Sequence, residues 1–278
     1  MCLECGKHNS KKAWYLDEEK HRLKSLGFAR DMIANKLNPL ITIGLKFVRL
    51  KQPDYINTKM NFVSRTLLSW FAKTLHGMQF LPNIEAVFST IDMANDLALM
   101  PCLCKKAMDP DDPPVYRCIA MNIAVSIYEK EGKNTEIKRI SKQQAKDLVV
   151  KWRKKGAWQS VGWLWDANVI WVCNCDEYCV AYRAPEATWG GIPSFMITTV
   201  GNASACNGCR DCADWCKHRA ISHGEDDIVR VDPNLCKGCG LCVENCENQV
   251  LVFEPRQTFY DVRTKKINYL GKETVHLD

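Results

Sequence analysis

The sequence lacks the features of a membrane-spanning or secreted chain. No apolar run reaches about 18 residues, roughly the length that a helix needs to cross a bilayer. The most apolar stretch, from Leu37 to Leu50, is interrupted by Lys46 and Arg49. The first residues, Met1-Cys2-Leu3-Glu4, do not have the pattern of a secretory signal. We therefore expect no transmembrane segment and a cytoplasmic location, where thiols stay reduced.

Motifs of several enzyme classes are also missing. The chain has no P-loop and no G-x-G-x-x-G, so a Rossmann-type nucleotide or flavin site is not expected. It has no G-x-S-x-G and no H-E-x-x-H, which mark many hydrolases and zinc proteases. The C-x₃-C-x₂-C triplet of radical-SAM enzymes does not occur either. A stand-alone enzyme of these classes is therefore not predicted.

Cysteine, in contrast, is abundant, and eight of the 16 cysteines form two runs of one spacing. The spacing C-x₂-C-x₂-C-x₃-C is the bacterial pattern for [4Fe–4S] clusters. Three closely spaced cysteines wrap one face of a cubane, and the fourth cysteine of each run ligates the other cluster. The pattern thus assigns one ligand set as Cys206, Cys209, Cys212 and Cys246, and the other as Cys236, Cys239, Cys242 and Cys216.

Disulfides or a zinc site would fit these two runs less well. Disulfides are rare in a reducing compartment. Zinc sites usually show two C-x₂-C pairs, not two triplets that are each followed by a fourth cysteine. Three glycines inside the runs suit loops whose backbone approaches sulfide closely, namely Gly208, Gly238 and Gly240. Two cubane clusters are therefore the preferred interpretation.

Roughly residues 195–255 resemble the two-[4Fe–4S] ferredoxin family, through these two runs. The resemblance implies two cubane clusters in a ferredoxin-like domain. The family usually has proline after the fourth cysteine of each run, whereas this chain has Lys217 and Glu247. Proline is not a ligand, so this departure concerns the packing beside each cluster, and hence its potential, rather than ligation.

A second group of cysteines lies upstream of the runs and includes two C-x-C pairs. Its members are Cys102, Cys104, Cys118, Cys173, Cys175 and Cys179. Alternate residues can point two sulfurs at one metal, so two such pairs supply four ligands. We predict a third iron–sulfur cluster between the loop after Pro101 and the end of a strand at 169–173. The alternatives are a zinc site or core thiols without a metal.

This upstream pattern has its own resemblance. The order Pro101-Cys102-x-Cys104-Lys105, then Cys118, then Cys173-Asn174-Cys175 is similar to a group of dicluster ferredoxin-domain proteins with an upstream helical cysteine domain. The resemblance implies electron transfer and an anaerobic setting. The chain has fewer cysteines than that group, because Asp109 to Asp112 and Asp176-Glu177 stand where more are expected. Farther upstream, Cys2 and Cys5 are either half of a metal site or part of a mobile terminus.

The predicted fold class is α+β, with a mainly helical N-terminal domain that contains a small β-hairpin, followed by a ferredoxin-like 2[4Fe–4S] domain. A capping box at Ser141-x-x-Gln144 starts one helix, and Gly156 closes it. Apolar periodicity predicts further helices at 17–37, 60–75, 84–100 (capped by Asn83) and 118–127. Strands are predicted at 158–165, 169–173 and 228–231.

We expect three parts of the chain. Residues 1–190 form the helical domain with the additional cysteine site, and residues 191–256 form the dicluster ferredoxin domain. Residues 257–278 form a charged C-terminal tail, in which 265–273 suits a small hairpin.

The formal net charge of +6 counts cysteine as neutral. An oxidised cubane with four thiolates carries about −2, so two clusters bring +6 to about +2 and a third brings it to about zero. A basic run at 138–155 contains only one acid, Asp147. Most such runs are solvated helix faces. Nucleic acid is not expected, since aromatic residues are not interleaved with these charges, and an acidic redox partner fits better.

The sequence therefore predicts an iron–sulfur electron-transfer protein or a subunit of an oxidoreductase complex. Electrons would pass through two ferredoxin clusters and a third, upstream cluster, with the chemistry supplied by the cofactors. One alternative is a reductase with a substrate-accessible cluster at the upstream site, because six thiols exceed the four that a cubane needs. The other alternative is an iron–sulfur protein that binds nucleic acid.

Overall fold

The structure is a computed structural model. It describes residues 13–21, 76–108, 113, 115–131, 136–164, 168–177, 179, 191–261 and 266–269. The predicted helix at 60–75, most of the one at 17–37, and both Cys2 and Cys5 lie outside the described residues. Two short 3₁₀ helices, Trp14–Leu16 and Glu18–His21, occupy the described start of the chain.

A six-stranded antiparallel sheet forms the centre of the N-terminal part. Its strand order is β1-β5-β6-β3-β2-β4. The strands are β1 (His76–Phe80), β2 (Leu97–Pro101), β3 (Tyr116–Met121), β4 (Lys138–Arg139), β5 (Trp158–Leu164) and β6 (Asn168–Cys175). The expectation of a mainly helical domain with a small hairpin is thus not confirmed for the described residues. The predicted hairpin exists, as β5 and β6, but it is the middle of a larger sheet.

Strands β2 and β3 are not predicted from the sequence pattern. Helix α4 (Ile84–Asp92) was expected to continue toward Met100, but it ends at Asp92 and β2 follows. The helix expected from Cys118 to Ile127 is instead β3 followed by α6 (Ile123–Glu131). Both strands are almost entirely buried, so they show no polar alternation. Periodicity alone cannot distinguish such short apolar runs from buried helix.

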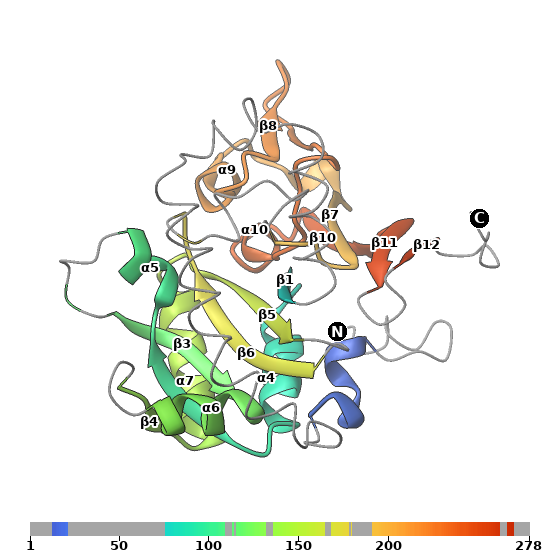
Figure 1. Ribbon diagram of the computed structural model, residues 1–278. Helices are drawn as coiled ribbons and strands as arrows, with labels where there is room; N and C mark the ends of the chain where they lie inside the picture. The colour runs from blue at the N-terminus through green and yellow to red at the C-terminus, as the bar shows by residue number, and fades with distance from the viewer. Residues whose placement is uncertain are drawn as a thin grey trace, which may run out of the picture.

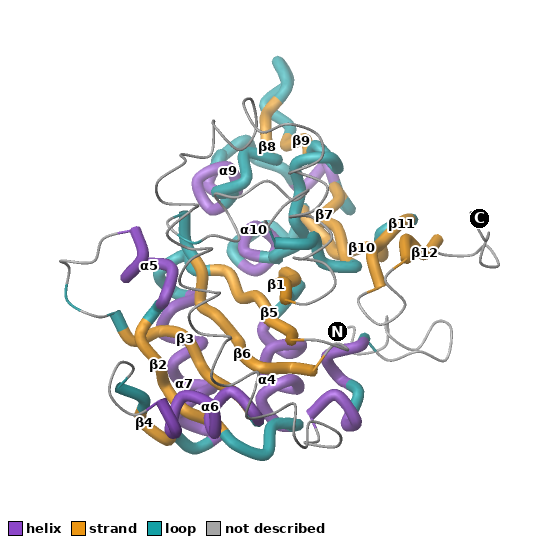
Figure 2. The backbone as a smooth tube through the Cα atoms, viewed as in Figure 1, coloured by secondary structure: helices purple, strands orange, loops and turns teal. Residues whose placement is uncertain are grey.

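Two helices cover one face of the sheet (Figure 2). Helix α4 begins where Asn83 Oδ1 accepts the Ala86 N–H at 2.9 Å, as predicted. Helix α7 (Lys142–Arg153) begins with the predicted capping box of Ser141 and Gln144. Both helices contribute to one apolar core with the sheet residues that face them. The opposite face packs against α6 and carries the upstream cysteines.

The ferredoxin segment lies against one end of this sheet, with α10 (Leu241–Glu244) close to β1 in the view of Figure 1. Strand β7 (Met196–Val200) pairs with β10 (Leu251–Pro255), and β8 (Ile221–His223) pairs with β9 (Val229–Val231). The predicted strand at 228–231 is therefore confirmed. The hairpin of the tail joins β11 (Thr258–Asp261) to β12 (Lys266–Tyr269), which is earlier than the predicted 265–273.

The two cysteine runs repeat each other in backbone conformation. Positive φ angles recur at Gly208 and Gly238 (71° and 66°) and at Arg219 and Gln249 (55° and 52°). Helix α9 (Asp211–Trp215) follows the first run's loop as α10 follows the second. A repeat at this level extends the repeat of cysteine spacing seen in the sequence, and it places the sulfurs of both runs in equivalent loops.

Candidate metal centres

The first ferredoxin site is a cavity lined by the sulfur-bearing residues Cys206, Cys209, Cys212 and Cys246. The fourth of these comes from the second run, not the first. Burial, together with the charges of its three partners, raises the pKa of Cys212 to about 11. The four residues that the spacing assigned to one cluster are therefore together.

The second site has the complementary composition. Burial raises the pKa of Cys242, and nearby Cys239, Cys216 and Cys236 contribute to the rise. The same two partners, Cys216 and Cys236, lie close enough to raise the pKa of Cys239. Cys216, the last cysteine of the first run, is thus near the three cysteines of the second run, as the crossed spacing requires.

These surroundings suit thiolates that bind a cationic metal centre. Burial penalises an isolated thiolate, and it raises the pKa of Cys239 to about 11. A metal supplies the compensating positive charge, because thiolates are its ligands. Backbone N–H groups also point at sulfur, from Ala220 to Cys216 Sγ at 3.3 Å and from Val250 to Cys246 Sγ at 3.4 Å. The residues present therefore fit the group that the spacing implies.

The glycines of the second run are required by close backbone contacts. A Cβ on Gly238 would lie 2.1 Å from the carbonyl oxygen of Met196, and one on Gly240 would lie 2.1 Å from that of Pro82. Both glycines also have positive φ angles. The cluster loop consequently packs tightly against β7 and against the loop before α4, which leaves no room for a side chain.

All six upstream cysteines converge at one end of the sheet. Cys118 on β3 is the direct cross-strand partner of Cys173 on β6. Cys173 and Cys175 project from the same face of β6, because side chains two residues apart on a strand share a face. Cys102 follows β2, and its backbone N–H donates to the Val115 carbonyl at 2.8 Å, beside the start of β3. The predicted juxtaposition of the Pro101 loop and the Cys173 strand end is therefore present.

The thiols of this group interact with one another. Hydrogen bonds with Cys104, Cys118 and Cys179 lower the pKa of Cys102 well below its usual value. Hydrogen bonds with Cys173 and Cys179 lower the pKa of Cys175 in the same way. Cys102, Cys118, Cys175 and Cys179 are buried, each at most 6% exposed. The site is therefore a buried, sulfur-rich pocket whose thiols lie within hydrogen-bonding reach of one another.

A buried arginine that sequence reasoning missed lies beside these thiols. Arg117 is 3% exposed and forms a two-pronged ion pair with Asp176, whose Oδ1 lies 2.9 Å from Nη2. The same Nη2 donates to Cys179 Sγ at 3.2 Å. The guanidinium offsets negative charge on the sulfurs. The resemblance predicts a cysteine at the position of Asp176, and the structure shows an aspartate that pairs with this arginine.

The cysteine ligands alone do not distinguish a zinc site from an iron–sulfur cluster. None of the fourteen cysteines in the described residues is in a disulfide. Within the same residues, no group of three or more His, Cys, Asp or Glu is arranged to hold a single metal ion. A cubane presents a different iron to each thiolate, so its ligands stand farther apart than those of one ion. Sulfur ligands suit both zinc and iron–sulfur clusters, and metal content separates the two.

The second ferredoxin site and the upstream thiols meet at one junction. Cys175 and Cys179 form an apolar group with Phe80, Trp158 and Leu241, against which Cys239 and Trp215 also pack. Trp158 is fully buried there. A cysteine of the second run and two cysteines of the upstream site therefore border one apolar group.

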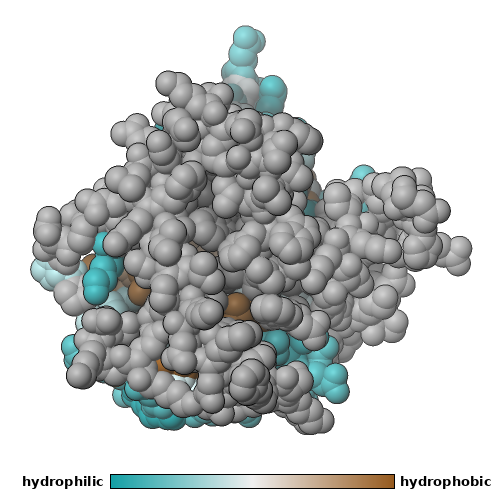
Figure 3. All heavy atoms as spheres, in the orientation of Figure 1, coloured by the Kyte–Doolittle hydropathy of each residue, from teal (hydrophilic) through white to brown (hydrophobic). Residues whose placement is uncertain are grey.

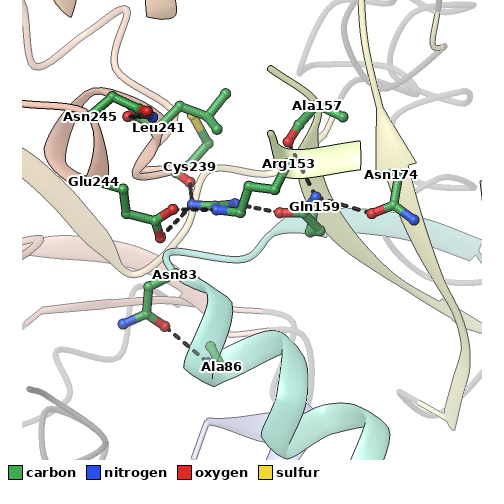
Figure 4. Close-up of polar contacts among 10 residues, drawn as sticks. All are labelled: Asn83, Ala86, Arg153, Ala157, Gln159, Asn174, Cys239, Leu241, Glu244 and Asn245. Carbon is green, nitrogen blue, oxygen red and sulfur yellow. Dashed lines mark hydrogen bonds and ion pairs between the residues drawn. The ribbon is translucent and has the colours of Figure 1, made fainter. Parts of the chain in front are cut away.

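Arg153, at the end of α7, crosses the same junction (Figure 4). It pairs with Glu244 of α10, and its Nη2 donates to the Cys239 carbonyl at 2.9 Å. The sequence placed Arg153 in a basic surface run, but it is 5% exposed. Its position was a usable signal, since Ala145, Val149 and Arg153 follow each other at intervals of four on the buried face of α7.

Two other basic side chains of that run form ion pairs within the domain. Arg139 contacts Asp96 at 2.8 Å and Glu129 at 2.6 Å, and Lys146 contacts Asp92 at 2.7 Å. The run is consequently less available to a partner than its composition suggested. Figure 3 shows hydrophilic residues elsewhere, at the projecting tip of the β8–β9 hairpin.

Comparisons with known proteins identify the ferredoxin part. Residues 228–251 match the family described as 4Fe-4S binding domain. The chain contains a ferredoxin-type iron–sulfur domain. It is 40% identical over 63 residues to a subunit of the Na(+)-translocating ferredoxin:NAD(+) oxidoreductase complex of Acetobacterium woodii, which covers 22% of this chain and 19% of that protein. It is 27% identical over 86 residues to the isethionate sulfite-lyase activating enzyme of Oleidesulfovibrio alaskensis, covering 31% and 27%.

These similarities are local. The matched stretch spans only 19% and 27% of the length of the two curated relatives. No solved structure matches the chain. Among the described residues, no helix combines the length and the apolar composition that crossing a bilayer requires. The upstream domain and its cysteines are thus interpreted from their own geometry.

Proposed function

We propose that the protein relays single electrons through two ferredoxin-type [4Fe–4S] clusters and a third [4Fe–4S] cluster at the upstream cysteines. The observation that carries this proposal is the junction at which Cys239 packs against the apolar group that contains Cys175 and Cys179. Adjacent sites suit the passage of electrons from one to the next. The clusters supply one-electron chemistry, and the protein sets their spacing and surroundings.

The proposed ligands follow the crossed spacing in the ferredoxin domain. One set is Cys206, Cys209, Cys212 and Cys246, and the other is Cys236, Cys239, Cys242 and Cys216. The upstream ligands are four of the six converging thiols, from Cys102, Cys104, Cys118, Cys173, Cys175 and Cys179. We retain the proposed division into 1–190, 191–256 and 257–278, with the middle part as the dicluster domain.

The order of the sites follows from their exposure. Cys209 is exposed, whereas Cys236 and Cys242 are buried, as is most of the upstream group. We therefore propose that a redox partner exchanges electrons at the cluster of Cys209. The partner is another redox protein or a larger oxidoreductase complex, and the relative from A. woodii is itself a complex subunit by name. The cytoplasm remains the expected compartment.

A reductase with its substrate at the upstream site is the second candidate. The surplus of two thiols over the four that a cubane needs favours it. Burial of Cys102, Cys118, Cys175 and Cys179 weighs against direct access of a substrate. Nucleic acid binding has less support, because Arg139 and Lys146 of the basic run are already paired with acids and Arg153 is buried.

Metal analysis of the anaerobically purified full chain tests the proposal. We expect about twelve iron and twelve acid-labile sulfide per chain, and bleaching by dithionite without turnover. Replacing Cys102 and Cys173 together by serine should remove about four iron and leave the ferredoxin EPR signals intact. Asn83→Ala, which removes a helix cap worth about 1 kcal/mol away from the thiols, controls for simple destabilisation.

Several outcomes would contradict parts of the proposal. Zinc without acid-labile sulfide would exclude the clusters, and unchanged iron in the double variant would exclude the third one. A spectral change on addition of a small substrate would favour the reductase. Salt-dependent binding to an oligonucleotide would favour the nucleic-acid alternative.

A further inference from the structure

The buried guanidinium of Arg153 contacts the second ferredoxin site at two places, in addition to its own domain. It forms two hydrogen bonds with the Glu244 carboxylate, from Nε at 2.5 Å and from Nη2 at 2.8 Å. Nη2 also donates to the Cys239 carbonyl at 2.9 Å, and Nη1 donates to Gln159. One side chain of the upstream domain thus holds the cysteine loop and the helix of the second ferredoxin site (Figure 4).

The orientation of Arg153 is fixed by further buried amides. Gln159, which is fully buried, donates from Nε2 to Asn174 Oδ1 at 3.0 Å. Asn174, also fully buried, donates to the Arg117 carbonyl at 2.7 Å. These residues project from the face of β5 and β6 opposite to Cys173 and Cys175. The chain of contacts leads from the Cys239 loop to the strand that carries the upstream arginine.

The positive charge of Arg153 is held at the backbone of the cysteine loop. Its Nη2 donates to the Cys239 carbonyl at 2.9 Å, which places a cation beside this ligand and favours negative charge on the site. The Glu244 carboxylate pairs with the same guanidinium, and its negative charge reduces this effect. At the first ferredoxin site the comparable pair, Arg210 and Asp227, is 65% and 61% exposed and therefore screened by solvent. The second ferredoxin site therefore lies beside a buried arginine, whereas the charged pair at the first site is screened by water.

We propose that Arg153 is a positioning residue that docks the Cys239 loop on the upstream domain and raises the reduction potential of the cluster held by Cys236, Cys239, Cys242 and Cys216. This inference rests on the proposed function. One electron, supplied by the redox partner protein or by dithionite in the titration, would change the charge of a four-thiolate cubane from about −2 to about −3, with no bond made or broken. A fixed cation nearby stabilises the more negative, reduced form, so reduction occurs at a higher potential.

An EPR-monitored redox titration of the full, cluster-loaded chain tests the inference with variants of opposite sign. Arg153→Gln removes the cation and should lower the midpoint potential of this cluster. Glu244→Gln removes the opposing carboxylate and should raise it. The combined Arg153→Gln/Glu244→Gln variant should return the potential toward that of the wild type, because both charges are absent.

Two further variants separate charge from simple packing. Arg153→Lys keeps the charge but loses the two-pronged geometry. The midpoint potential of the cluster should therefore stay close to that of the wild type, while the Cys239 loop is held less firmly. Arg210→Gln, at the exposed pair, should leave the potential of the Cys239 cluster unchanged. If Arg153→Gln does not fold with its clusters, Glu244→Gln carries the test alone: a raised midpoint potential supports the role of these charges, and an unchanged or lowered one overturns it.

The outcomes distinguish this inference from the proposed function. If the wild type binds no iron–sulfur cluster, the proposed function fails. If the wild type has its clusters and Arg153→Gln and Glu244→Gln leave the potential unchanged or shift it in the same direction, only the role of Arg153 is overturned. A merely structural role would lower cluster occupancy in both variants without opposite shifts.

Discussion

Cys118 on β3 lies directly opposite Cys173 on β6, in neighbouring antiparallel strands of the central sheet. The chain between them forms α6, β4, α7 and β5 before it returns. Their proximity is therefore a consequence of strand pairing, which fixes the register of every side chain on both strands. Strand pairing therefore fixes the relative positions of Cys118, Cys173 and Cys175, the three upstream cysteines that lie on strands.

The crossed arrangement of the ferredoxin cysteines predicts a selective loss. Cys216→Ser should damage the cluster of Cys236, Cys239 and Cys242, because Cys216 lies with them and not with its own run. EPR of the reduced protein should show one altered cubane signal and one intact signal. Cys246→Ser is the matched control and should alter the other signal. Loss of the same signal in both variants would contradict the crossing.

Arg117 is predicted to stabilise the upstream site. Arg117→Met leaves Asp176 without its ion-pair partner and should cost about 3 kcal/mol, the low end for a buried pair because Asp176 is 36% exposed. Urea denaturation followed by tryptophan fluorescence measures this cost. The double variant Arg117→Met/Asp176→Asn should recover part of it. Equal stability of Arg117→Met and the wild type would show that the pair contributes nothing.

Gly162 of β5 should not tolerate a side chain. A Cβ there would lie 1.7 Å from Trp171 Nε1, so it would overlap the indole ring. The Trp171 side chain is only 6% exposed, and its neighbours leave it no room to move away. Gly162→Ala should therefore destabilise the protein by about 3 kcal/mol through overpacking. Gly224→Ala is the control, since its Cβ meets the far ends of the exposed Arg230 and Asp226 side chains. Thermal unfolding compares the two, and similar melting temperatures would refute the packing argument.

His21 should make stability dependent on pH. It is 2% exposed, with Nε2 at 2.8 Å from the Tyr15 carbonyl, and burial lowers its pKa below the usual 6.5 despite the opposing effects of that hydrogen bond and of Asp17. The unfolded chain then binds a proton more readily than the folded one. Stability from this residue is complete above about pH 6.5 and is lost as the pH falls below that value.

A comparison with His21→Gln measures this effect. Unfolding midpoints recorded between about pH 7.5 and pH 5.5 should fall more steeply in the wild type than in the variant, which has no titrating group at this position. Parallel slopes would mean that another group causes the pH dependence. Lys142, which also lowers the pKa of His21, should be left unchanged in both proteins.

The sequence by itself determined the ferredoxin part. Cysteine spacing is a local property, and a loop with three cysteines at fixed intervals cannot reach the fourth corner of its own cubane. Local hydrogen bonds likewise determined the caps at Asn83 and Ser141, and two short strand-like segments separated by three turn residues, 166–168, predicted the pairing of β5 with β6. Each of these signals involves residues close together in the chain.

Tertiary structure alone decided the sheet of the upstream domain. Strands β2 and β3 are buried, so their sequences carry no alternation that distinguishes them from helix. The partners of Arg117 and Arg153 were decided in the same way. Each is buried because a distant carboxylate, Asp176 or Glu244, neutralises it there, and a basic residue in a sequence does not reveal that partner.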